Sequence, residues 1–290
     1  MKAGTNTTAQ ALRTLTFVWN HPANRSRRLL SITRAVAFQV RSRLSAAPVK
    51  APLGYRSHLL VYRHSAGASK VVYANPPDWP EMQTWARLLG VGDVFVDVGA
   101  NAGLYSVWAA ELGAKPIAVE PDPDNKARIV ENFRLNHVNG EVHECALGSE
   151  PGSGLFSVGL DTLNHVVTST EATAATREVR IATLDGLLRG RSVRGVKIDV
   201  EGFERLVVEG AFSALAEGRI DVLQLEWNDT SLEALGEGRE PVAAILIGCG
   251  YTLCRPDPDT LRLVRVRQLK TGPDLFAVSP RLAAELVAEF

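Results

Sequence analysis

Residues 93–106 read DVFVDVGANAGLYS. Alternating apolar residues predict a buried strand over Val94–Val98, yet the residues that follow are poor strand formers. Within that strand, an Asp97 carboxylate without a partner would be costly to bury. Gly99 and Gly103 permit a tight turn with close backbone approach, and the helix predicted to follow offers unpaired amide groups to an anionic ligand group. We therefore expect a ligand site at this strand end.

Short apolar strands alternate with helical segments along the rest of the chain. This order predicts an α/β fold, in which a mostly parallel sheet is covered by helices on both faces. Strands are expected at Val94–Val98, Pro116–Glu120, Glu141–Cys145, Val196–Val200 and Val222–Glu226. Helices are expected at Tyr105–Leu112, Pro123–Asn136, Phe203–Ala216 and Ser231–Ile247. Three apolar segments within residues 251–279 read as antiparallel strands at the edge of the sheet.

Charge is distributed unevenly along the 290 residues. No Asp or Glu precedes Asp78, whereas nine Lys or Arg residues precede residue 51. This asymmetry predicts a basic extension over residues 1–50, a strand and helix lead-in over 51–90, and the main domain over 91–290. Because no apolar run is long enough to span a bilayer and no secretory signal begins the chain, we expect a cytoplasmic protein.

The basic extension contains an amphipathic segment within residues 20–44. Its apolar stripe falls at helical spacing: Leu29, Ile32, Val36, Val40 and Leu44. One interpretation is a helix packed by this stripe on the acidic remainder of the chain. The other is an interfacial helix on anionic lipid, which would place the protein peripherally at the inner membrane face. Nucleic acid is not expected as a partner, because no binding motif or interleaving of basic and aromatic residues is present.

The second predicted strand supports a nucleoside-containing ligand. Glu120 closes it about twenty residues after the glycine turn, where a carboxylate can accept hydrogen bonds from two ribose hydroxyls. A dinucleotide loop would require further glycines where Asn101 and Leu104 stand. S-adenosylmethionine fits better, because Asp97, the loop amides and Glu120 suit its ammonium, carboxylate and ribose respectively.

Four segments, FVDVGANAGLYS, AVEPDPDN, ATLDGLL and VKIDVEGFE, together resemble the FkbM-type family of S-adenosylmethionine-dependent methyltransferases. The resemblance covers roughly residues 91–280 and implies a Rossmann-like class I methyltransferase domain with a seven-stranded sheet. It also implies methyl transfer to a hydroxyl of a sugar, glycolipid or secondary metabolite. The cofactor contacts expected by this resemblance are Asp97, Gly99, Asn101, Gly103 and Glu120, with Asp199 as a further contact.

Candidate catalytic residues lie at the ends of two later strands. Alternation places Lys197, Asp199 and Glu201 on one side of their strand, so one face of the strand end is charged. Glu226 lies on the following strand with Gln224 and Asn228, and these polar side chains are expected to face the same pocket. A carboxylate within reach of an acceptor hydroxyl can take its proton, so Asp199 and Glu201, then Glu226, are the expected base or orienting groups.

Alternatives remain open for these acids. They can form a structural network with Lys197 or cap the next helix. A divalent ion held by Asp199, Glu226 and Asn228 is a further alternative, although no metal is assigned.

The sequence thus predicts an O-methyltransferase that acts by in-line displacement on a small-molecule or glycolipid acceptor. The alternatives are an N- or carboxyl-methyltransferase acting on a peptide and a non-catalytic nucleoside-binding protein.

Overall fold

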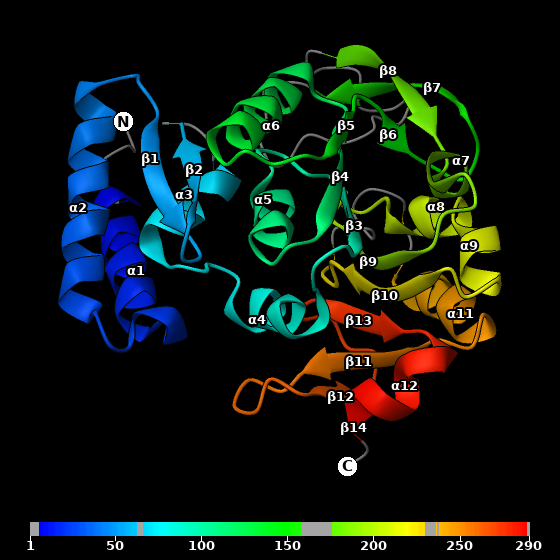
Figure 1. Cartoon of the computed structure of the whole chain (residues 1–290). Coiled ribbons are helices and arrows are strands. Elements are labelled where there is room, and N and C mark those ends of the chain that lie inside the picture. The colour runs from blue at the N-terminus through cyan, green and yellow to red at the C-terminus, as the bar shows by residue number, and fades with distance from the viewer. Residues whose placement is uncertain (1–5, 63–65, 158–175, 230–235, 237, 289–290) are drawn as a thin grey trace.

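The computed structural model describes residues 6–62, 66–157, 176–229, 236 and 238–288 of the chain (Figure 1). Its centre is a sheet with the strand order β14-β12-β11-β13-β10-β9-β3-β4-β5. In that order the strands are β14 (Val287–Ala288), β12 (Leu263–Arg265), β11 (Thr252–Pro256), β13 (Leu275–Val278), β10 (Ile220–Leu225), β9 (Val193–Ile198), β3 (Val94–Val98), β4 (Lys115–Val119) and β5 (Glu141–His143).

The expected mostly parallel arrangement is present. Strands β5, β4, β3, β9 and β10 run parallel to one another, whereas β13 inserts antiparallel between β10 and β11. The described part of the sheet has nine strands rather than the seven implied by the resemblance, because β12 and β14 extend it beyond β11. The two additional strands lie at the edge of the sheet, and the central strands lie where the hydrophobic pattern predicted them.

Helices cover both faces of the sheet (Figure 1). On one face lie α4 (Trp79–Leu88), α5 (Leu104–Glu111) and α6 (Pro123–Leu135). On the other lie α7 (Leu184–Leu188), α8 (Glu204–Glu209), α9 (Phe212–Ala216) and α11 (Glu240–Gly248). The remaining helix, α12 (Pro280–Leu286), packs against β13 and β14.

Strand alternation separates the two hydrophobic cores. Phe95 belongs to the core shared with α4, α5 and α6, while Val96 and Val98 belong to the core shared with α7, α8, α9 and α11. Successive side chains of a strand point to opposite faces, so Asp97 lies on the Phe95 side. Asp97 therefore lies on the same side of the sheet as α5.

Two predicted helices differ from the structure. The helix expected over Phe203–Ala216 is divided into α8 and α9, with Gly210 as the C-cap of α8. The backbone at Gly210 passes close to another chain segment, and a Cβ there would lie 2.1 Å from the Gly148 carbonyl oxygen. Of the helix expected over Ser231–Ile247, residues 230–235 and 237 lie outside the described residues, and α11 begins only at Glu240.

Residues 146–182 contribute a smaller sheet with the order β6-β8-β7. Its strands are β6 (Ala146–Leu147), β7 (Gly152–Ser157) and β8 (Thr176–Ala182). The strand expected over Glu141–Cys145 ends at His143, and the chain then enters β6.

The N-terminal region adds two further layers beyond α5 and α6 (Figure 1). The first contains β1 (Val49–Leu53), β2 (Ser57–Val61) and α3 (Ala66–Tyr73), and the outer one contains α1 (Asn6–Asn20), the 3-10 turn η1 (Pro22–Asn24) and α2 (Arg28–Leu44). No helix among the described residues combines the length and apolar character needed to cross a membrane.

Helix α2 does not pack by its predicted apolar stripe. Its buried residues are Ser31, Ala35 and Phe38, whereas Leu29, Val36, Val40 and Leu44 are exposed. The expectation that this stripe covers the acidic remainder of the chain is therefore wrong. The helix packs instead on α1 and α3 through its opposite face.

Candidate active site

The carboxyl ends of β3, β9 and β10 meet at one edge of the sheet. Asp97 pairs in register with Lys197, and Lys197 pairs with Gln224 on the next strand. A cavity of about 250 Å³ opens beyond these ends. It brings together six of the predicted site residues: Asp97, Gly99, Asn101, Asp199, Glu201 and Glu226. Ligands of open α/β sheets bind in this position.

The turn after β3 requires glycine at its first position. Gly99 has a φ of +77°, and a Cβ there would lie 1.9 Å from the backbone oxygen of Asp199. Gly103, with a φ of +82°, is the N-cap of α5. The turn can therefore pass close to β9 and lead directly into the helix, as the sequence predicted.

Asp97 is buried at the base of this turn. Its Oδ2 accepts hydrogen bonds from the backbone N–H of Ser106 at 2.9 Å and from the Ser106 hydroxyl at 2.7 Å. Burial raises the pKa of Asp97, and the positive charge of Lys197 opposes that rise. Asp97 thus anchors the first turn of α5 as well as lining the cavity.

Glu120 lies beside the turn and is not among the residues that line the cavity. Its two carboxyl oxygens accept from the backbone N–H groups of Asn101 at 2.8 Å and Asp122 at 2.9 Å. Burial raises the pKa of Glu120 to about 7, although these hydrogen bonds act to lower it. In this position Glu120 holds the loop that carries Asn101.

Lys197 is the buried cation of the site. Its Nζ lies 2.7 Å from Oδ2 of Asp199 and 4.7 Å from the centre of the Tyr105 ring. Burial acts to lower the pKa of Lys197, but the charges of Asp199 and Asp97 outweigh it and raise the pKa overall. The structural network proposed for this lysine is therefore present.

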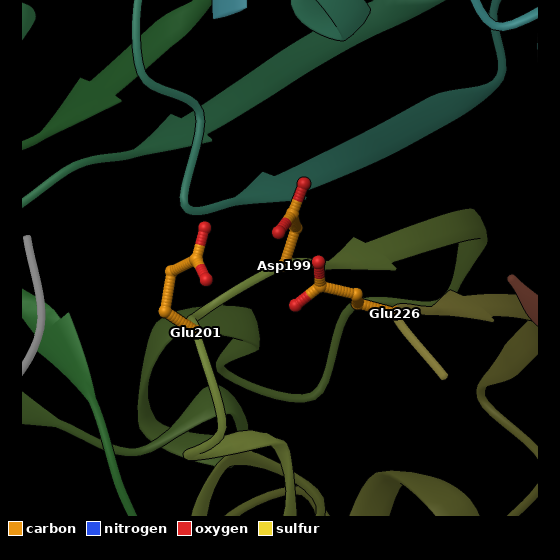
Figure 2. Close-up of side chains that lie close together, drawn as sticks. All are labelled: Asp199, Glu201 and Glu226. Atoms are coloured by element: carbon orange, nitrogen blue, oxygen red, sulfur yellow. The ribbon is translucent and has the colours of Figure 1, made fainter. Parts of the chain in front are cut away.

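Asp199, Glu201 and Glu226 form a cluster in which one oxygen from each residue lies within 4.8 Å of the others. Figure 2 shows the carboxyl group of Glu226 directed toward that of Asp199. Partial burial acts to raise the pKa of Asp199, but the ion pair with Lys197 lowers it overall. Asp199 is thus a stable anion next to the other two acids.

Glu226 behaves differently from Asp199. Burial, together with the negative charges of Asp199 and Glu201, raises its pKa to about 8. Its Oε2 is buried and has no hydrogen-bond partner among the described residues. A carboxyl group with these properties keeps its proton at neutral pH and can exchange it with a bound ligand.

A second ion pair supports the loops that carry these acids. Glu204 accepts from the backbone N–H of Gly202 at 3.2 Å and forms a buried salt bridge with Arg239. Arg239 in turn donates to the backbone and side-chain oxygens of Asn228, both at 3.0 Å. Glu201, between the two strand ends, has a φ of +52°. Such backbone conformations in non-glycine residues are strained and are often found at functional sites.

The contacts of these acids and of Asn228 also show which oxygens are available to bind a metal ion. Oxygens of Asp199, Glu201 and Glu226 are close enough to hold a divalent ion. The alternative weighed from the sequence used Asn228 instead of Glu201, but the amide oxygen of Asn228 accepts from Arg239. Lys197 already lies beside Asp199. These acids can thus serve proton transfer or ion binding.

Among the cavity residues that were not predicted from the sequence are Lys70, Asp78 and Tyr105. Lys70 of α3 lies 3.5 Å from Asp78, which accepts at 3.2 Å from the hydroxyl of Tyr105. Lys70 belongs to no motif, and only the unusual position of Asp78 as the first acid of the chain could have drawn attention to this region. Gln224, expected to face the pocket, instead donates to Asp274 at 2.7 Å within the buried interior.

The residues present fit S-adenosylmethionine. Gly99 lines the cavity, and Leu104 and Tyr105 line it at the first turn of α5, where amide groups lack intrahelical acceptors. Lys70 adds a cation whose side chain is 56% exposed. Cationic and amide donors suit a carboxylate, while the acids suit an ammonium and a sulfonium.

Comparisons with known proteins agree with this site. The family described as Methyltransferase FkbM domain matches residues 97–253, more than half of the chain. The chain is 29% identical over 197 residues to the 31-O-demethyl-FK506 methyltransferase FkbM of Streptomyces tacrolimicus, covering 56% of this chain and 74% of that protein. It is 28% identical over 136 residues to the hexuronic acid methyltransferase AglP of Haloferax volcanii, covering 46% of this chain and 56% of that protein.

Among solved structures, the chain is similar to a Pyrococcus abyssi tRNA (uracil-54, C5)-methyltransferase in complex with S-adenosyl-L-homocysteine. The TM-score is 0.42 at 12% identity, covering 80% of this chain and 44% of that one. The match of the family over residues 97–253 includes the glycine turn and all three clustered acids. This chain therefore belongs to the FkbM family and is an S-adenosylmethionine-dependent methyltransferase.

Proposed function

We propose that this enzyme is an O-methyltransferase that methylates a hydroxyl of a sugar, glycolipid or secondary metabolite. The observation that carries the proposal is Glu226, a carboxyl group with a raised pKa and an unpaired oxygen in the cavity, as far as the described residues show. A hydroxyl becomes a good nucleophile as its proton leaves, and such a carboxylate can accept that proton. The printed names of the two relatives, which concern an O-demethylated natural product and a hexuronic acid, support this acceptor class.

The cofactor supplies an electrophilic methyl group when it is bound. We assign its amino-acid end to the turn at Gly99, Asn101 and Gly103, with Asp97 near the ammonium and Lys70 near the carboxylate. Glu120 is assigned to the ribose, because each oxygen that accepts one backbone hydrogen bond can accept another.

The three clustered acids have different roles in this proposal. Glu226 accepts the hydroxyl proton in its deprotonated form, and the fraction of that form increases as the pH rises toward its pKa of about 8. Asp199, held by Lys197, keeps a fixed negative charge that raises the proton affinity of Glu226 and faces the cofactor. Glu201 orients the acceptor by hydrogen bonding. Holding the acceptor oxygen in the reactive geometry contributes a large part of the rate.

The test is methyl transfer from labelled S-adenosylmethionine by the full chain. Acceptors should include methyl glycosides, glycosides of uronic acids and a glycolipid fraction, and mass spectrometry should locate the methyl group. We expect it on a hydroxyl oxygen. A methyl group on nitrogen or on a carboxylate would instead support the alternative of an N- or carboxyl-methyltransferase acting on a peptide or related acceptor.

Membership of the FkbM family overturns the alternative of a non-catalytic nucleoside-binding protein. Peripheral membrane contact through the basic N-terminal helix remains part of the proposal, because a glycolipid acceptor is presented at a membrane surface.

A further inference from the structure

Helix α2 exposes most of its large apolar side chains, with Phe38 as a buried exception. Four of them repeat at intervals of seven, four and four residues and therefore share one helix face. Their exposed fractions are 75% for Leu29, 50% for Val36, 50% for Val40 and 82% for Leu44. The buried face of the helix is formed by Ser31, Ala35 and Phe38. The four exposed side chains therefore form an apolar stripe on α2, which belongs to the outermost layer of the molecule (Figure 1). We call Leu29, Val36, Val40 and Leu44 the α2 stripe.

One polar residue falls within the α2 stripe, and its hydroxyl is already paired. Thr33 donates to the backbone oxygens of Leu29 at 3.2 Å and Leu30 at 2.9 Å. A hydroxyl paired in this way costs less to move out of water than an unpaired one. Leu30, 62% exposed, lies next to the stripe and widens it.

Cations border the α2 stripe on both sides. At about 100° per residue, Arg43 falls beside one edge and Arg41 beside the other. Both side chains are exposed. No acidic residue precedes Asp78 anywhere in the chain. Helices α1 and α2 therefore carry no acid, and a basic helix with an apolar face is typical of helices that lie in the plane of an anionic membrane.

Other occupants fit this surface less well. A second copy of the chain would place the same arginines against each other across a two-fold axis, with no acid in the extension to pair them. Nucleic acid would satisfy the arginines but would leave four apolar side chains in water. Anionic lipid satisfies both, since headgroups pair with the arginines while the apolar residues enter the acyl region.

We propose that α2 docks the enzyme on anionic membranes, with Leu29, Val36, Val40 and Leu44 inserted below the headgroups. The docking helix is connected to the active site through α3. Arg34 of α2 donates to the backbone oxygen of Val72 in α3 at 2.7 Å. The rings of Phe38 in α2 and Tyr73 in α3 pack edge to face, with 6.2 Å between their centroids. The same helix α3 contributes Lys70 to the cavity wall.

One helix, α3, thus lies between the docking helix and the cavity. Because a docked enzyme would hold its active site near the membrane, the acceptor is a lipid-linked saccharide presented there. The choice of acceptor rests on the proposed O-methylation. Lipid binding by α2 does not, and the two can fail separately.

The experiment is flotation of the full chain with vesicles of phosphatidylcholine alone or with about one third phosphatidylglycerol. We expect binding only to the anionic vesicles, weakening as salt is raised. Replacing the α2 stripe by Leu29→Ser, Val36→Ser, Val40→Ser and Leu44→Ser should reduce binding at least about tenfold. Arg41→Gln with Arg43→Gln should weaken it less and reduce its salt dependence.

The matched control removes exposed apolar residues elsewhere. Phe212→Ser with Ile247→Ser changes α9 and α11, on the other side of the sheet, and should leave flotation unchanged. Calorimetry with S-adenosylhomocysteine should give the same affinity for all variants, which shows that they are folded and that the active site is intact.

Two results would overturn the docking proposal. One is flotation that is absent in the wild type or unchanged by loss of the stripe. The other is a wild-type dimer in light scattering that becomes monomeric when the stripe is replaced, which would assign this face to a second copy. A docked enzyme that methylates only water-soluble acceptors would overturn the acceptor assignment alone.

Discussion

The acids at the ends of β3 and β4 and those at the ends of β9 and β10 share one edge of the sheet but differ in their hydrogen bonding. Asp97 and Glu120 accept backbone N–H groups and hold the glycine turn in place. Asp199 and Glu226 face each other, and a single buried lysine pairs with Asp199. Asp97, Glu120 and the glycine turn, held in place by hydrogen bonds to backbone amides, form the binding half of the site. Asp199, Glu201 and Glu226 form the crowded half, in which acids that lie close together raise the pKa of one of them, so that it retains a proton that can be transferred.

The largest effect should come from the crowded half of the site. Glu226→Gln keeps the shape and the neutral form of the side chain but cannot accept a proton. We expect a loss of about 10²- to 10⁴-fold in kcat with little change in the affinity for S-adenosylhomocysteine. Steady-state kinetics and calorimetry measure the two quantities, and Glu144→Gln at an exposed position is the control. Near wild-type turnover would remove Glu226 as the base.

The binding half should respond to Gly99→Ala. A Cβ at this position clashes with the Asp199 backbone oxygen, so the turn must move away from β9. We expect the affinity for S-adenosylhomocysteine to fall by about 100-fold, with a lower Tm. Gly92→Ala is the control, because Gly92 has a φ of +90° with open space around its Cβ position. Equal effects of the two substitutions would show backbone strain alone to be responsible.

Lys70→Met tests how far the binding half extends toward the N-terminal region. Loss of a charged hydrogen bond to the cofactor carboxylate should raise the Kd of S-adenosylhomocysteine by about tenfold. The Kd of 5′-methylthioadenosine, which lacks the amino-acid end, should not change. Lys115→Met, at the exposed start of β4, controls for general loss of charge. A parallel loss of both ligands would place Lys70 elsewhere in the site.

The pH dependence should distinguish the two halves. Because the folded protein raises the pKa of Glu226 to about 8, it binds this proton more tightly than the unfolded chain does. The resulting stability is fully present below the ordinary glutamate pKa and is lost as pH rises through about 8. Between about pH 5 and pH 9 the wild type should lose up to about 4 kcal/mol more than Glu226→Gln, less the part that solvent screens at this partly exposed carboxyl.

Over the same range, kcat/KM of the wild type should rise and level off above about pH 8. Denaturant unfolding and initial rates measure these opposite trends. A pH-independent difference in stability between the wild type and Glu226→Gln would contradict the raised pKa.

Metal removal should have the smallest effect. Because Lys197 already compensates one charge of the cluster, we expect a chelator to change turnover by less than about twofold. Dialysis against a chelator, followed by separate additions of Mg²⁺, Mn²⁺ and Ca²⁺, tests this. A large loss that one ion restores would replace proton transfer by ion binding as the role of the three acids.

The sequence by itself determined the central strands, the glycine turn and the side of the sheet on which Asp97 and Lys197 lie. These features follow from local rules: side chains alternate along a strand, and only glycine accepts the backbone close to β9. The cluster of Asp199, Glu201 and Glu226 was predictable for the same reason, because the carboxyl ends of neighbouring parallel strands meet at one edge.

Tertiary structure alone decided which acid retains a proton, that Lys70 reaches the cavity and that the apolar stripe of α2 faces outward. Each depends on groups far apart in the chain: burial and neighbouring charges set the pKa of Glu226, and the packing of α3 on β1 and β2 positions Lys70. Helical periodicity shows that α2 has two different faces. It does not say which face is buried, because that depends on the total free energy of all contacts the helix can form.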